Sequence, residues 1–323
     1  MAHTNSDRPV LRSRVRTAGG RLAPRTAALL LALGLLGGAA PASAGLRVFA
    51  CEPVWAAVAR EIGGDRVDVY SATTPQQDVH YIQARPSIIA KVRRADLLVC
   101  RGADLEIGWL PVLLRKGRNP RVQPGKPGHL EVARIVPMLD VPTQLDRAAG
   151  DIHPRGNPHT QTDPHNIARV ADEIARRMAQ IDPEGAASYE QRHAAFSKRW
   201  SDAIARWELR AAPLRGAEVV THHLAWVYAA HWLGLHVVAH LEPKPGIPPT
   251  AGHLAELLDT LAHRHVRAIV RASYQSGQAS DWLSERTGVP AVVLPHAPGA
   301  VPGADDLFAM FDILIDTLLE TKP

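Results

Sequence analysis

Short apolar runs alternate with helical patterns along most of this chain, and this alternation limits the folds open to it. The runs are rich in valine, leucine and isoleucine, as is typical of strands buried on both faces of a parallel sheet. Helical patterns follow most of them, so we expect α/β units with crossover helices. The predicted strands are 46–51, 67–70, 96–100, 217–221, 237–241, 268–271 and 291–294.

One helical pattern is much longer than the others and separates two groups of α/β units. After Pro183, large apolar residues continue at helical spacing as far as residue 213. A helix of this length is unusual inside a globular domain. We therefore expect two small parallel-sheet lobes, 45–182 and 214–323, joined by a stiff helix at 183–213; an ordinary packed helix is the alternative. The stripe consists of Tyr189, Phe196, Trp200, Ile204 and Trp207.

The first 44 residues, 1–44, have the pattern of a secretory signal peptide. Arginines precede an apolar segment, 27–40, that is too short to span a bilayer, and Ala42-Ser43-Ala44 resembles a cleavage site. We therefore expect a periplasmic protein. Six of the 37 basic residues and one of the 32 acidic residues lie in this leader, so the remainder carries no net charge with histidine neutral. This balance gives no support to a nucleic-acid partner.

The chain has only two cysteines, Cys51 and Cys100. Each ends an apolar run that is predicted to be a strand, and adjacent parallel strands would bring the two close together. An oxidising compartment permits a disulfide, and two small buried side chains are the alternative. The choice depends on geometry, so both interpretations stay open at this point.

Histidines in loops carry the strongest chemical signal. His159 lies between Pro158 and Pro164, and proline restricts both its own backbone and that of the residue before it. His80, His223 and His296 follow predicted strands, and open parallel sheets bind ligands beyond the carboxyl ends of their strands. We therefore predict that one metal ion is bound between the lobes. The predicted ligands are His80, His159, His223 and His296.

The ligand type favours one metal over another. Sites built from imidazole alone suit zinc, whereas manganese prefers more carboxylate oxygen. We therefore predict Zn²⁺ as the bound ion, with Mn²⁺ as the weaker alternative. Each ligand should also have an acceptor for its second ring nitrogen. The nearest candidates by motif are Asp78, Glu106, Asp163 and Glu242.

The histidine segments resemble those of the zinc- and manganese-binding proteins of bacterial ABC importers, the ZnuA/TroA-like (cluster A-I) family. Asp78-Val79-His80 is similar to a D-P-H segment of that family. Gly156-Asn157-Pro158-His159, followed by Asp163-Pro164, resembles its N-P-H-x-x-x-D-P segment. The resemblance extends over essentially the whole chain after the leader, and the long helix resembles the family's rigid interdomain helix.

A third family segment has a histidine five positions before an aromatic residue. His223 and Tyr228 have this offset, which favours His223 over His222 as the ligand. The resemblance implies a binding protein, not an enzyme, that delivers Zn²⁺ or Mn²⁺ to an ABC permease and its ATPase at the inner membrane. We expect it to act as a monomer.

The chain also departs from the family pattern. Arg271 stands where the family often has a glutamate, and Pro295-His296 stands where it usually has an aspartate. The histidine-rich insertion of zinc-specific members is absent after His80. We expect the window 146–153 to form a mobile lid instead. His153, a carboxylate or water are the alternatives to His296 for the fourth ligand.

Two other functions remain as alternatives. A secreted zinc hydrolase would need an open metal position and a general base, but neither an H-E-x-x-H nor a G-x-S-x-G motif occurs in the sequence. A binding protein for a non-metal solute would need an aromatic pocket. The candidate lining residues for such a pocket are Trp109, Trp226 and Tyr274.

Overall fold

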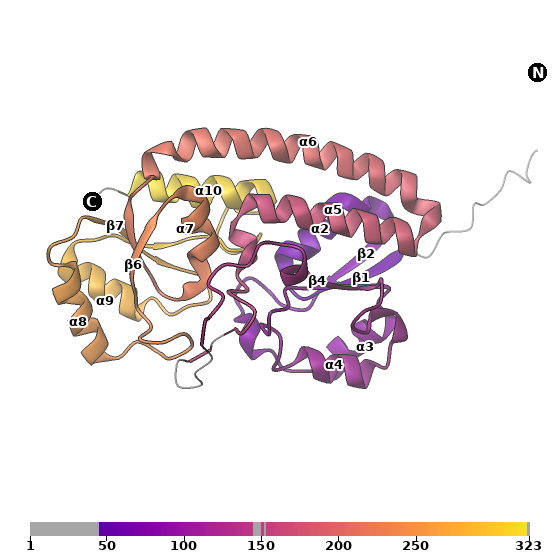
Figure 1. Ribbon diagram of the computed structural model, residues 1–323, viewed down its shortest axis with the longest axis horizontal. Helices are drawn as coiled ribbons and strands as arrows, with labels where there is room; N and C mark the ends of the chain where they lie inside the picture. Colours follow the sequence, from indigo (N-terminus) through magenta and orange to yellow (C-terminus); the bar gives the residue numbers. More distant parts are fainter. Residues whose placement is uncertain (1–44, 145–149, 152, 322–323) are drawn as a thin grey trace, which may run out of the picture. The chain divides into compact units, whose positions relative to one another are not determined.

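The computed structural model describes residues 45–144, 150, 151 and 153–321. The predicted signal peptide and most of the predicted lid therefore lie outside the described residues. Two parallel sheets form two α/β lobes, and a long helix passes over both (Figure 1). None of the helices described has the length and apolar character needed to cross a membrane.

The N-terminal lobe contains a parallel sheet with the strand order β2-β1-β3-β4. The central strand β1 pairs with both neighbours, so that Val48 lies opposite Val69 on one side and Leu97 on the other. The strands are β1 (Leu46–Ala50), β2 (Val67–Ser71), β3 (Leu97–Cys100) and β4 (His129–Glu131). The helices are α2 (Pro53–Gly63), α3 (Pro86–Arg94), α4 (Leu110–Gly117) and α5 (Pro164–Ile181).

The C-terminal lobe repeats the same arrangement with the order β6-β5-β7-β8, again entirely parallel. The alternation in the sequence is thus confirmed in both lobes. The strands are β5 (Glu218–Thr221), β6 (His236–His240), β7 (Val266–Arg271) and β8 (Ala291–Val293). The helices are α7 (Val227–Leu233), α8 (Ala251–Leu261), α9 (Gln278–Thr287) and α10 (Leu307–Glu320).

The long helix is α6 (Ala186–Ala211), and short 3-10 turns flank it at Pro183–Gly185 and Ala212–Leu214. It packs against α2 and α5 of the first lobe and against α10 of the second. Trp200 Nε1 donates to the carbonyl oxygen of Pro164 at 2.9 Å, and Trp207 Nε1 donates to Asp312 Oδ1 at the same distance. The helix is therefore hydrogen-bonded to both lobes through the buried indole rings of two tryptophans.

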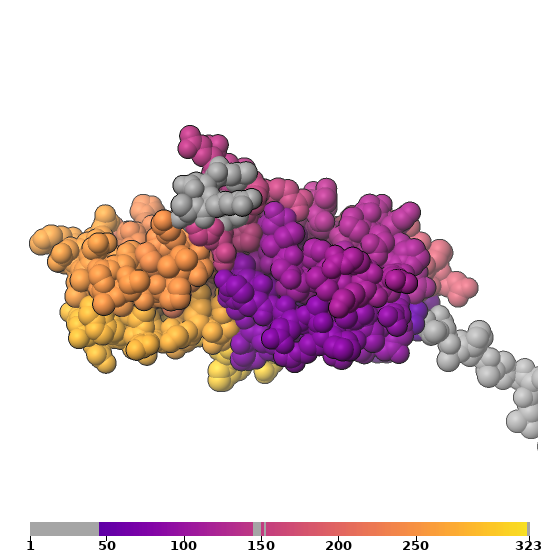
Figure 2. Space-filling model, turned by 90° about the horizontal axis from the view of Figure 1, so that it is seen from below, coloured from indigo at the N-terminus to yellow at the C-terminus, as the bar shows by residue number. Residues whose placement is uncertain are grey.

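The buried stripe of α6 differs from the prediction toward its C-terminal end. Ala203 and Ala211 are buried, whereas Ile204 is only partly buried against the core. The aromatic rings of the stripe continue into α10, with Trp207 and Phe311 at a centroid distance of 5.0 Å. One apolar cluster therefore runs through residues of both lobes, and Figure 2 shows the lobes meeting along a common boundary.

Cys51 and Cys100 form a disulfide, which resolves the alternatives left open by the sequence. Cys51 directly follows β1 and Cys100 ends β3, two strands that are neighbours in the sheet. Parallel neighbours bring the two Cα atoms to 4.9 Å, within the range that a disulfide needs. Both side chains are fully buried.

Candidate metal centre

His80 lies in a single 3-10 turn, Val79–Tyr81, in the loop that follows β2. Asp78 caps this turn: its Oδ1 accepts the backbone N–H of His80 at 3.0 Å and the ring Nδ1–H at 2.7 Å. A carboxylate can only accept, so Nδ1 carries the proton and Nε2 keeps its lone pair. Burial alone would raise the pKa of Asp78, but the hydrogen bonds and charge of His80 outweigh it and lower that pKa.

His159 has the same local arrangement with a different acceptor. Asn157 lies two residues before it, and Asn157 Oδ1 accepts both the backbone N–H and the ring Nδ1–H of His159, each at 3.0 Å. The ring is buried, with 4% of the residue exposed. Burial lowers the pKa of His159 well below its usual range, and the charges of His223, Arg101 and His80 lower it further. The imidazole is therefore neutral near pH 7.

His223 follows β5 in the other lobe and reaches the same space. Its Nδ1–H donates to Glu242 Oε2 at 2.6 Å, and Glu242 lies just beyond the end of β6. The same carboxylate oxygen accepts the backbone N–H of Gly246 at 2.9 Å. The neighbouring His222 lies with its Nε2 4.0 Å from Glu242 Oε1. The ring of His223, and not that of His222, groups with those of His80 and His159.

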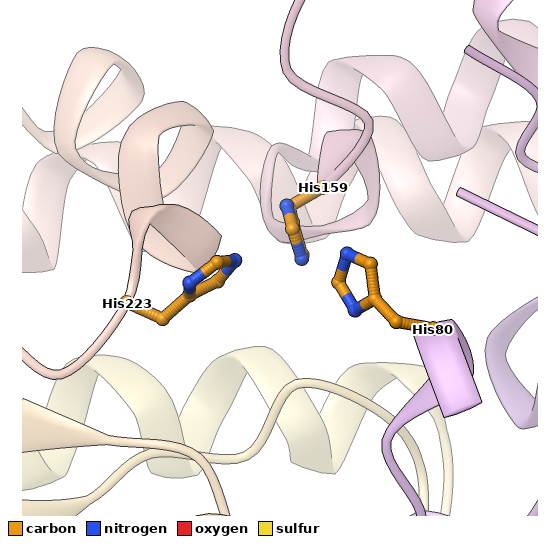
Figure 3. Close-up of side chains that lie close together, drawn as sticks. All are labelled: His80, His159 and His223. Atoms are coloured by element: carbon orange, nitrogen blue, oxygen red, sulfur yellow. The ribbon is translucent and has the colours of Figure 1, made fainter. Parts of the chain in front are cut away.

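The three rings converge between the lobes (Figure 3). One ligand nitrogen of each can be chosen so that all three lie within 4.8 Å of one another. Ring centroids are 5.7 Å apart for His80 and His159, 5.9 Å for His80 and His223, and 5.1 Å for His159 and His223. Because each Nδ1 is engaged with an oxygen, the three Nε2 atoms remain as donors for a cation.

The fourth predicted histidine, His296, is not part of this group. It is buried beyond β8, and its ring packs edge-on against Tyr274 at a centroid distance of 5.1 Å. Its Nδ1 is buried and has no hydrogen-bond partner among the described residues. Burial lowers the pKa of His296 to about 3, with a further contribution from Arg101.

A buried charged cluster lies beside the centre. Arg101 pairs with Glu52, and Glu106 Oε1 accepts the backbone N–H of Arg101 at 2.7 Å. Burial and the adjacent Glu52 raise the pKa of Glu106 to about 8. Glu106 and Asp163 were predicted to orient histidine ligands, but Glu106 binds this backbone instead. Asp163 caps α5 by accepting the backbone N–H of His165 at 2.8 Å.

The cleft beside the histidines has a volume of about 580 Å³ and is lined by residues of both lobes, among them Asp78, Glu242 and Tyr274. Trp109 and Trp226, which were candidates for an aromatic solute pocket, are instead buried in the core. Arg271 Nη1 donates to the carbonyl oxygen of Gln275 at 3.1 Å. Asp78 and Glu242, which accept hydrogen bonds from the rings of His80 and His223, are thus part of the cleft wall.

The model of the zinc-uptake complex component A periplasmic family (ZnuA) matches residues 48–321. The chain belongs to this family. Solved structures agree with the assignment of the fold: a crystal structure of ZnuA superposes with a TM-score of 0.70 at 20% identity, covering 86% of this chain and 100% of the other.

Curated relatives of the chain carry names that refer to metal binding. The iron-binding protein YfeA of Yersinia pestis is 26% identical over 72% of this chain and 70% of its own length. The metal ABC transporter substrate-binding lipoprotein SsaB of Streptococcus sanguinis is 22% identical over 77% of this chain and 79% of its own length. The chain is thus similar to the substrate-binding components of metal importers over most of its length.

Proposed function

We propose that this protein is the substrate-binding component of an ABC importer that captures Zn²⁺ and delivers it to a membrane permease. The observation that carries the proposal is the convergence of three imidazole nitrogens, from His80, His159 and His223, on one point between the lobes. Family membership supports the transport role. We propose binding without catalysis and periplasmic action after removal of residues 1–44.

The donor set favours zinc. Three imidazoles supply nitrogen ligands, and such sites suit Zn²⁺ better than Mn²⁺, which prefers oxygen. The positive charge of the ion would be offset by the carboxylates of Asp78 and Glu242. These carboxylates do not contact the ion but accept hydrogen bonds from the Nδ1 atoms of two proposed ligands. Acceptors of this kind orient a ligand ring and raise its basicity. Mn²⁺ remains the weaker candidate.

Delivery requires that the ion be released when the protein meets its permease. His80 and His159 belong to residues before α6, whereas His223 lies after it, so a small separation of the lobes would remove one ligand from the other two. The two indole hydrogen bonds of α6 oppose a wide hinge motion. We therefore propose boundaries at 45–182, 183–213 and 214–323, and release of the ion from a monomer by a small shift of the lobes.

Equilibrium dialysis of the metal-free protein, followed by metal analysis, tests this function. We expect one Zn²⁺ to be bound per chain and Zn²⁺ to win in competition with Mn²⁺. His159→Ala should lower the zinc affinity by orders of magnitude. His165→Ala is the matched control, because His165 is an exposed histidine paired with Glu208 at 3.0 Å on the surface. Equal zinc binding by His159→Ala and the wild type would contradict the proposal.

A further inference from the structure

A fourth imidazole lies beside the three converging rings. His153 Nδ1–H donates to the carbonyl oxygen of Ala103 at 2.9 Å, and its Nε2 is buried with no partner in the described part of the chain. We propose that His153, and not His296, is the fourth ligand of the ion bound by His80, His159 and His223. This inference rests on the proposed function, since it completes the same site.

The hydrogen bonds of the ring nitrogens distinguish His153 from His296. In His80, His159 and His223 the Nδ1–H is taken by an oxygen, which leaves Nε2 with a lone pair. His153 has this arrangement as well, because a main-chain carbonyl can only accept. No described residue accepts a hydrogen bond from the buried Nδ1 of His296, so this ring lacks the acceptor that the other four share.

The position of His153 also fits a ligand. Its ring centroid is 5.6 Å from that of His80, which matches the spacing between His80 and the other two ligands. His153 lines a cavity of about 230 Å³ together with His159 and His223. Its Nε2 lies outside the group of nitrogens within 4.8 Å, so the ring has to advance toward the ion on binding.

The main chain that holds His153 is strained. Ala103 and Asp104, in the turn after β3, have positive φ angles of 48° and 63°. Residues with a Cβ rarely adopt this conformation, and it persists only where the surrounding structure holds it. Ala103 is fully buried, and its carbonyl is the acceptor for His153 Nδ1–H. The strained turn therefore presents the oxygen that sets the orientation of this ring.

The surroundings of His296 disfavour a cation. The cavity that it shares with His80 and His159 has a volume of about 10 Å³, which is room for about one water molecule. Arg101, which is paired with Glu52, takes up part of the wall of this cavity. The limited space around His296 argues for His153 as the fourth ligand.

X-ray absorption spectroscopy of the zinc-loaded protein tests the proposal, because it counts imidazole ligands directly. We expect four imidazoles in the wild type and in His296→Ala, and three in His153→Ala. His153→Phe is a second variant, which keeps a ring in this position but has no ring nitrogen. It should also bind zinc through three imidazoles, and it serves as the test if truncation to alanine disturbs the fold. The visible spectrum of the Co²⁺ protein should change in both His153 variants, and zinc affinity should fall about ten- to a hundredfold.

Three imidazoles in the wild type, or a ligand lost in His296→Ala but kept in both His153 variants, would overturn the assignment of His153. The failure of the wider proposal has a different signature. If His159→Ala also leaves zinc binding unchanged, the ion does not occupy this centre at all. If only His159→Ala weakens binding, the three-histidine site stands and His153 is not a ligand.

Discussion

The side-chain amide of Asn157 binds the ring of His159 through its oxygen and the main chain of the C-terminal lobe through its nitrogen. Its Oδ1 accepts Nδ1–H of His159 at 3.0 Å, and its Nδ2 donates to the carbonyl oxygen of Leu224 at 2.9 Å. Leu224 directly follows His223, a proposed ligand from the C-terminal lobe. The orientation of one proposed ligand is therefore coupled to the position of another across the cleft.

Replacing Asn157 should weaken zinc binding although no ligand is removed. We expect Asn157→Ala to lower the zinc affinity about ten- to a hundredfold, because His159 loses the acceptor that fixes its ring. Asn119→Ala is the matched control: Asn119 is also buried and donates to the carbonyl oxygens of Val92 and Ala95. Titration with a competing chelator should show normal affinity in the control, and equal affinities in both variants would contradict the role of Asn157.

The carboxylate of Glu242 should contribute through its charge. In Glu242→Gln the side chain keeps its size but no longer attracts the Nδ1–H of His223 as a carboxylate does, so we expect at least about a tenfold loss of zinc affinity. Glu208→Gln provides the comparison, because Glu208 contacts His165 at 3.0 Å on the surface. Isothermal titration calorimetry distinguishes the two, and a larger effect from Glu208 than from Glu242 would count against this account.

The disulfide should stabilise the fold without contributing to the site. Removing it in Cys51→Ser/Cys100→Ser is expected to cost about 2–5 kcal/mol of unfolding free energy. Neither cysteine is among the residues that line the cavities around the histidines, so the zinc affinity should stay close to that of the wild type. Urea unfolding under oxidising conditions measures the first quantity. Identical unfolding midpoints would show that the bond adds nothing.

Acid should destabilise the metal-free protein through its buried histidines. The pKa of His296 is lowered to about 3 in the fold, so below its unfolded pKa of about 6.5 the unfolded chain binds a proton that the folded chain does not. Stability is therefore complete above that value and is lost as the pH falls. At about pH 5 this one group costs about 2 kcal/mol relative to neutral pH.

The comparison of the wild type with His296→Asn isolates this contribution from other titrating groups, such as Glu106. The unfolding free energy of the wild type should decrease relative to that of the variant by about 2 kcal/mol between about pH 7.5 and about pH 5. Denaturant unfolding at several pH values gives the difference. A difference that does not change with pH would mean that His296 is not kept neutral by burial.

The sequence predicted most of the strands because each is a short apolar run that ends at a polar loop. Two elements were missed for physical reasons. The strand β4 has only three residues, His129–Glu131, and begins with a histidine. The helix α4, Leu110–Gly117, follows a turn in which Ala103 and Asp104 have positive φ angles. Neither residue is a glycine, so the sequence does not mark them as left-handed. Local patterns of this kind are too weak to identify an element without its tertiary contacts.

The acceptors of the site show the same limit. Asp78 and Glu242 were candidates by motif, and they accept Nδ1–H from His80 and His223, two of the proposed ligands. Asn157 was not among the predicted acceptors, all of which were carboxylates. The signal was present in the sequence, since Asp78 and Asn157 each lie two residues before a histidine. The pairing of Glu242 with His223, by contrast, depends on the neighbouring strands β5 and β6.

The most direct test of the central claim is an anomalous-difference map from crystals of the zinc-loaded protein, recorded at the zinc absorption edge. The account predicts one strong peak between His80, His159 and His223, with their Nε2 atoms at about 2.0–2.1 Å from it. A zinc peak elsewhere on the molecule, with these three rings left without a metal, would contradict it.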